Sequence, residues 1–192
     1  MEFVYIISIF IILVSVYMFI QNKNTEVTYV VSKIDNKKYL VQNQPDKQEA
    51  ADLLANVKLS LMKVCQHLKD KYPQRDDIKR LNEKFNPDVI VEAEPNSKST
   101  SYSINKGEKI VLCLRSRDEE RKLVDHNIMM FVSLHELAHI MTKSVGHTDE
   151  FWKNFQFLLK EAVEMGMYKD VDFKKNPTEY CGVTITDSPL HN

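Results

Sequence analysis

The sequence contains little material for long flexible linkers or for a disulfide framework. Only four glycines and six prolines occur in 192 residues, and no repeat or low-complexity tract interrupts the chain. Cys65, Cys113 and Cys181 are odd in number and widely spaced, so we expect three buried free thiols. This composition predicts one domain with a hydrophobic core and little linker beside it.

An excess of basic residues is also missing. The formal net charge is −1, from 26 Lys and Arg against 27 Asp and Glu. Proteins that hold nucleic acid by bulk electrostatics usually carry a marked positive excess. We therefore do not expect this chain to bind nucleic acid through bulk charge.

A long apolar run near the N-terminus, FVYIISIFIILVSVYMFI, occupies residues 3–20. A helix of that length spans about 27 Å, close to the hydrocarbon thickness of a bilayer. No Lys or Arg precedes the run and no small-residue cleavage site follows it, which makes a cleavable signal peptide the weaker alternative. We expect residues 1–22 to form a transmembrane anchor and residues 23–192 to form the functional domain.

The flanking charges bear on orientation. Glu2 precedes the run and Lys23, Glu26 and Lys33 follow it, which weakly favours a cytoplasmic C-terminal domain by the positive-inside tendency. The cysteine pattern points the same way, as does the lack of an Asn-x-Ser/Thr acceptor, since Pro177 blocks the candidate at Asn176. The prediction is a single-pass membrane protein with its catalytic domain facing the cytoplasm.

Hydrophobic periodicity predicts an α+β fold with a small antiparallel sheet. Strands are expected at residues 27–31, 39–41, 89–91, 100–104 and 109–114, and helices at 46–72, 76–85, 128–141 and 148–165. One strand of the sheet could form an edge beside the active site, where an extended substrate would add as a further strand.

The sequence His135-Glu-Leu-Ala-His139 lies in the apolar helix expected at residues 128–141. A four-residue spacing projects both imidazoles from one helical face, where they can hold one metal ion. Glu136 lies about 100° further round the helix, which suits a general base acting on water. His147 follows Gly146 and precedes a new amphipathic helix, so a turn there can bring it back as the third ligand.

Two ordinary buried helix histidines are the alternative interpretation. Buried imidazoles and a carboxylate would then carry a desolvation cost of several kcal/mol unless a charge compensates them. We therefore predict Zn²⁺ bound by His135, His139 and His147. Tyr180 is a candidate donor to the oxyanion that forms when water attacks a peptide carbonyl. A tyrosine that seals the core explains this residue equally well.

The histidine motif, Gly146-His147, Phe151-Trp152 and the segment Tyr180-Cys-Gly182 resemble the WLM metallopeptidases and their SprT-like relatives, above all variants of large DNA viruses and some protists. The resemblance implies a minimal zincin domain, zinc held by three histidines and Glu136 as the base. Characterised relatives cleave proteins crosslinked to DNA or carrying ubiquitin-like tags. The predicted membrane anchor and the absence of a basic tail depart from that pattern.

Together these observations predict a membrane-anchored zinc metalloprotease that acts on protein substrates. Two alternatives remain open. One is a non-catalytic, membrane-tethered binding module that zinc stabilises. The other is a DNA-associated protease that repairs crosslinks. The sequence indicates neither the oligomeric state nor the cleavage preference.

Overall fold

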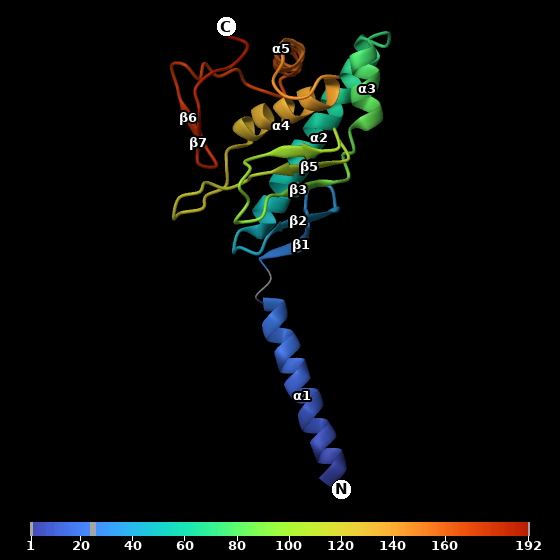
Figure 1. The fold of residues 1–192 in the computed structure, drawn as a ribbon, viewed down its shortest axis with the longest axis vertical. Coiled ribbons are helices and arrows are strands. Elements are labelled where there is room, and N and C mark those ends of the chain that lie inside the picture. The colour runs from blue at the N-terminus through green and yellow to red at the C-terminus, as the bar shows by residue number, and fades with distance from the viewer. Residues whose placement is uncertain (1, 24–25, 192) are drawn as a thin grey trace.

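The computed structural model describes the backbone of residues 2–23 and 26–191, and the side chains of residues 5–18 and 26–191. Its elements follow the order expected for an α+β chain (Figure 1). They are α1 (Glu2–Lys23), β1 (Val27–Val31), β2 (Lys38–Gln42), α2 (Lys47–Lys71), α3 (Asp76–Lys84), β3 (Ile90–Glu92), β4 (Tyr102–Ile104), β5 (Lys109–Leu112), α4 (His126–Met141), α5 (Asp149–Glu164), β6 (Thr178–Tyr180) and β7 (Val183–Ile185).

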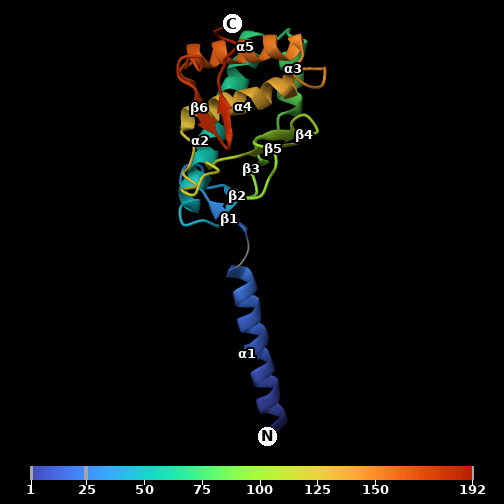
Figure 2. The ribbon, with the colours of Figure 1, turned by 60° about the vertical axis from the view of Figure 1, so that its left-hand side comes forward.

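The long helix α2 runs along the domain and contacts strands β1, β2 and β3 as well as helices α3, α4 and α5. Its apolar residues recur at the predicted three- and four-residue spacing, and Leu54, Leu61 and Leu68 are fully buried. The prediction that this stripe packs on the core of its own domain is confirmed. Helix α4 lies between the sheet and α5, so it is covered from both sides (Figures 1 and 2).

The central sheet has the strand order β3-β5-β4. Strands β4 and β5 form the predicted antiparallel pair, but β3 runs parallel to β5, so the sheet is mixed. The chain passes from β3 to the far edge before it turns back, and this route sets β3 and β5 in the same direction. Strand β4 is left at an edge of the sheet, next to α4.

The predicted transmembrane anchor corresponds to helix α1. The apolar run does form a helix, and its described side chains are exposed, for example Tyr5 at 67% and Phe10 at 66%. Within the residues that the structure describes, however, no helix is both long enough and apolar enough to cross a bilayer. The predicted membrane anchor and single-pass location are therefore wrong.

The cysteines correct a second prediction. Cys113 follows β5 and Cys181 lies in the turn between β6 and β7, and the two form a disulfide with a Cα–Cα distance of 6.3 Å. Only Cys65 is the buried free thiol that we expected, and burial raises its pKa to about 12. The fold joins positions 68 residues apart, which sequence spacing could not reveal. The argument from free thiols to a cytoplasmic domain is lost with this correction.

Candidate metal centre

The predicted ligand helix is α4, and local interactions fix both of its ends. Asp125 caps the N-terminus by accepting a hydrogen bond from the backbone N–H of Asn127. At the other end, the Thr142 hydroxyl donates to the carbonyl of Ala138 and accepts from the side-chain amide of Asn154 on α5. Most of the side chains between these ends are buried, so the helix is a rigid support for the residues that it presents.

The structure brings the three predicted histidines together. One nitrogen from each of His135, His139 and His147 lies within 4.8 Å of the others. The Nε2 atoms of His135 and His147 are 3.0 Å apart. Two nitrogens held at about 2.0–2.1 Å by one tetrahedral zinc ion lie about 3.3 Å apart, so this spacing suits a shared ion. No fourth His, Cys, Asp or Glu joins the cluster in the part of the chain that the structure describes.

Phe151 on α5 packs against the rings of all three histidines. Its ring is fully buried and contacts all three imidazoles, with centroid distances of 4.9 Å to His135, 4.3 Å to His139 and 4.7 Å to His147. This apolar support has an electrostatic consequence. Burial lowers the pKa of His139 to about 4 and also lowers the pKa of His147. A lowered pKa favours the uncharged form of His139 and His147, which is the form of imidazole that binds metals.

The segment between α4 and α5 returns His147 to the site. Gly146 takes a left-handed backbone conformation (φ 85°) just before the histidine, which is the turn that we expected. Thr148 then caps α5 by accepting from the N–H of Phe151, which confirms the predicted helix start. The Glu150 carboxylate accepts hydrogen bonds from the backbone N–H groups of Lys143 and Ser144. These bonds, together with one from the Ser144 hydroxyl, lower the pKa of Glu150 to about 2.

Lys106 holds the same segment from the other side. Its Nζ donates to the carbonyl oxygens of Thr142, Lys143 and Ser144 at 2.8, 2.7 and 3.0 Å. These carbonyls follow the C-terminal end of α4, where the helix dipole favours a cation. The guanidinium of Arg80 donates to the preceding carbonyl, that of Met141. Burial lowers the pKa of Lys106, which nevertheless supplies the hydrogens for all three bonds.

The turn that presents Lys106 depends on Gly107. Its φ of +114° is strained for any other residue, and a Cβ would lie 2.5 Å from the carbonyl oxygen of Lys84. The turn residues Asn105-Lys106-Gly107 predicted a hairpin, and that hairpin is confirmed. The sequence did not predict that this turn also fixes the segment that carries His147. Thirty-six residues separate Lys106 from Thr142, and only the folded chain brings them together.

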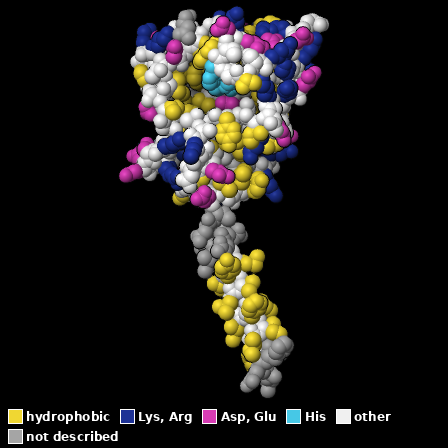
Figure 3. All heavy atoms as spheres, viewed as in Figure 1, with side chains coloured by type: hydrophobic (Ala, Val, Ile, Leu, Met, Phe, Trp, Pro, Cys, Tyr) yellow, Lys and Arg dark blue, Asp and Glu magenta, His cyan; other side chains and the backbone are white. Residues whose placement is uncertain are grey.

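Glu136, the residue predicted to act as a general base, lies in the same cleft as the histidines. Its side chain is 4% exposed, and Oε1 lies 3.3 Å from Nδ1 of His135. A hydrogen on Nδ1 would point at this carboxylate and leave Nε2 with its lone pair for a metal ion. Glu136 lines a cleft of about 550 Å³ together with the three histidines, Lys106 and residues 100–103 beside β4. Figure 3 shows the histidines gathered in a hollow on one face of the domain.

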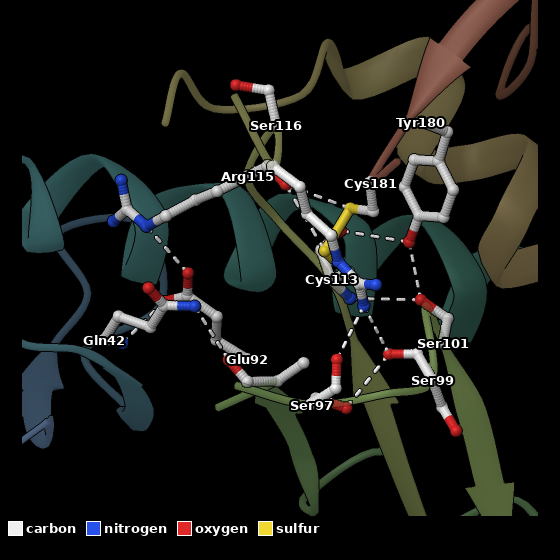
Figure 4. The surroundings of a disulfide bond; sticks show 12 residues. Gln42, Glu92, Ser97, Ser99, Ser101, Cys113, Arg115, Ser116, Tyr180 and Cys181 are labelled. Carbon is white, nitrogen blue, oxygen red and sulfur yellow. Dashed lines mark hydrogen bonds and ion pairs between the residues drawn. A yellow bond between two sulfur atoms is a disulfide. The ribbon is translucent and has the colours of Figure 1, made fainter. Parts of the chain in front are cut away.

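Tyr180 lies next to this site, but its hydroxyl is already engaged. It donates to the carbonyl of Cys113 at 3.0 Å and pairs with the Ser101 hydroxyl (Figure 4). Ser101 in turn accepts from the N–H of Cys113, which closes a ring of three hydrogen bonds. Burial raises the pKa of Tyr180. This geometry makes Tyr180 part of a wall beside Glu136, and its role as an oxyanion donor stays a prediction.

Fold and site together define a class: an α+β domain with a His-Glu-x-x-His helix and a third histidine from the following helix start. Residues 75–189 match the sequence model of the WLM domain. The chain belongs to this family, as the resemblance in its motifs indicated.

The chain is also similar to individual viral proteins and to one solved structure. Uncharacterized protein R325 of Acanthamoeba polyphaga mimivirus is 37% identical over 189 residues, which cover 96% of this chain and 95% of the viral protein. Uncharacterized protein 136R of Invertebrate iridescent virus 6 is 34% identical over 98 residues, which cover 50% of this chain and 53% of that protein. Among solved structures, Wss1 of Saccharomyces cerevisiae aligns with 66% of this chain and 87% of its own, at a TM-score of 0.48 and 21% identity.

Proposed function

We propose that this protein is a zinc-dependent metalloendopeptidase. The observation that carries the proposal is the convergence of three imidazoles with the adjacent, almost fully buried Glu136 in one open cleft. A site that holds zinc only for stability is normally closed by four protein ligands. Here the described residues offer three, and a carboxylate suited to proton transfer stands beside them.

His135, His139 and His147 would hold the ion. Bound zinc supplies a Lewis acid that polarises a substrate carbonyl and lowers the pKa of water. Glu136 takes the proton from the attacking water and passes it to the amine nitrogen as the peptide bond breaks. Its position beside His135 keeps the carboxylate within the cleft through both transfers.

Strand β4 supports a polypeptide as the substrate. It lies at an edge of the central sheet, and residues 100–103 line the same cleft as the histidines. An extended chain can add to such an edge through backbone hydrogen bonds, whatever its sequence. That arrangement would bring a peptide bond in front of Glu136.

Two substitutions test the proposal on the full chain. Glu136→Gln keeps the shape of the side chain but removes the base, so we expect zinc content to stay at one ion per chain and cleavage of an unfolded protein substrate to be abolished. His147→Ala removes a ligand, so we expect zinc to be lost on dialysis. His126→Ala is the matched control, because His126 begins the same helix outside the cluster. We expect it to keep both zinc and activity.

The outcomes separate the alternatives. Wild-type activity in Glu136→Gln would refute the mechanism. Tightly bound zinc without cleavage of any substrate would identify a non-catalytic, zinc-stabilised binding module. Cleavage that appears only when DNA is added, and that declines with rising salt, would identify a DNA-associated protease.

A further inference from the structure

A second, smaller cavity opens beside Glu136. Its volume is about 170 Å³, and it shares Thr100, Ser101, His135 and Glu136 with the metal cleft. Phe131 and Val132 of α4 line one side, and Tyr180 and Ile185 of the β6–β7 hairpin line the other. The cleft and the cavity therefore meet at the residue that would act as the base.

This position relates the cavity to the bond that would be cleaved. A general base acts within about 3 Å of the proton it removes, or through one water, so the reacting carbonyl must lie close to Glu136. Side chains of an extended peptide alternate in direction at about 3.3 Å per residue. With the cleaved bond at Glu136, one of the two flanking residues would direct its side chain towards the cavity, while its neighbour would point away.

The chemistry of the walls selects the kind of side chain. Phe131, Val132 and Ile185 supply apolar surface, and the hydroxyl of Tyr180 already donates to the carbonyl of Cys113. The carboxylate of Glu136 at the mouth repels a substrate Asp or Glu. An apolar cavity of about 150 Å³ can hold a benzene molecule, so this space suits one side chain the size of Leu, Ile, Met or Phe.

The hairpin wall is tied to the rest of the site. Tyr180 ends β6, and the next residue, Cys181, is bonded to Cys113 at the end of β5 (Figure 4). Antiparallel pairing sets Ile185 opposite Thr178, on the same hairpin. The disulfide and the hydrogen bonds of Tyr180 thus hold this wall against Cys113 and Ser101.

We propose that this cavity is the pocket that receives a substrate side chain next to the cleaved bond, and that it selects an uncharged apolar residue of Leu to Phe size. The proposal rests on the proposed peptidase function and adds its substrate preference. Ile185 determines the width of the pocket, and Glu136 at its mouth excludes acidic residues. Burial of one such side chain corresponds to about a ten- to hundredfold preference in kcat/KM over glycine.

The test uses the zinc-loaded full chain and a mixture of peptides, with cleavage positions read by mass spectrometry. Two matched peptides, with Leu or Gly at the selected position, then give kcat/KM. In Ile185→Trp the indole fills the pocket, so we expect the Leu peptide to lose at least tenfold while the Gly peptide is retained. Val183→Trp is the control, because Val183 lies on the same strand but is 49% exposed and outside the cavity.

Each result decides a different point. Cleavage without a side-chain preference, or a Leu preference that survives in Ile185→Trp, would overturn the pocket and leave the peptidase function standing. No cleavage by the wild type would overturn both. If Ile185→Trp fails to fold, Ile185→Ala serves instead. Its wider pocket is expected to shift the preference towards Phe and Trp, and an unchanged preference would refute the proposal.

Discussion

Removal of the Cys113–Cys181 disulfide is expected to lower stability by an amount that follows from the loop it closes. The cysteines are 68 residues apart, and the chain-entropy relation for a loop of that length gives about 4 kcal/mol at 25 °C. For a chain of this size, each kcal/mol lowers the melting temperature by about 2–4 °C. The double substitution Cys113→Ser and Cys181→Ser should therefore melt about 8–16 °C below its parent.

The assay compares thermal unfolding in a Cys65→Ala background, so that no remaining thiol can exchange. A chelator keeps all samples metal-free, because zinc bound to the native state would add its own binding free energy. Serine substitutions are preferred to thiol reductants, which bind zinc themselves. A thiol titration of the denatured wild type should find one free cysteine, Cys65. Three free thiols, or melting within about 2 °C of the parent, would refute the reasoning.

Two further predictions concern the segment that carries His147. Lys106→Met should raise the zinc dissociation constant about tenfold or more in a chelator competition, while the metal-free protein stays folded, because three carbonyls lose their common donor. Lys109→Met is the control. Equal zinc affinities of Lys106→Met and the wild type would show that Lys106 does not position His147. Glu150 has a folded pKa of about 2 against an ordinary value of 4.5, so it stabilises the metal-free fold above pH 4.5 and loses this effect as the pH falls towards 2. Urea unfolding of Glu150→Gln should show a stability deficit at pH 6 that shrinks below pH 4.5, and a pH-independent deficit would contradict this.

The arrangement of the histidines follows from short-range features of the sequence. His135 and His139 are one helical turn apart. The turn that brings His147 to the other two histidines is predicted by Gly146, Thr148 and the apolar stripe of α5. Helical periodicity and capping residues act over a few positions, so a sequence pattern is enough to indicate them. The boundaries of α2, α3 and α5 were predictable for the same reason.

The features that the sequence did not reveal depend on contacts between distant segments. Lys106 reaches the end of α4 across 36 residues, and the disulfide spans 68. Neither position has a local pattern that distinguishes it from an exposed turn lysine or a buried thiol. The parallel pairing of β3 with β5 is likewise a property of topology. The apolar run at residues 3–20 correctly indicated a helix, but its apolar character alone led to a membrane assignment that the structure does not bear out.

The disulfide also makes the segment that carries the three histidines a covalently closed ring. Residues 114–180, which include α4, α5 and all three histidines, lie between the bonded cysteines. If the protein cut itself at a single exposed position within this ring, the two pieces would stay joined and migrate as one chain on a non-reducing gel. Self-cleavage there would become visible only after reduction. A nick could therefore accumulate without release of either half of the metal site.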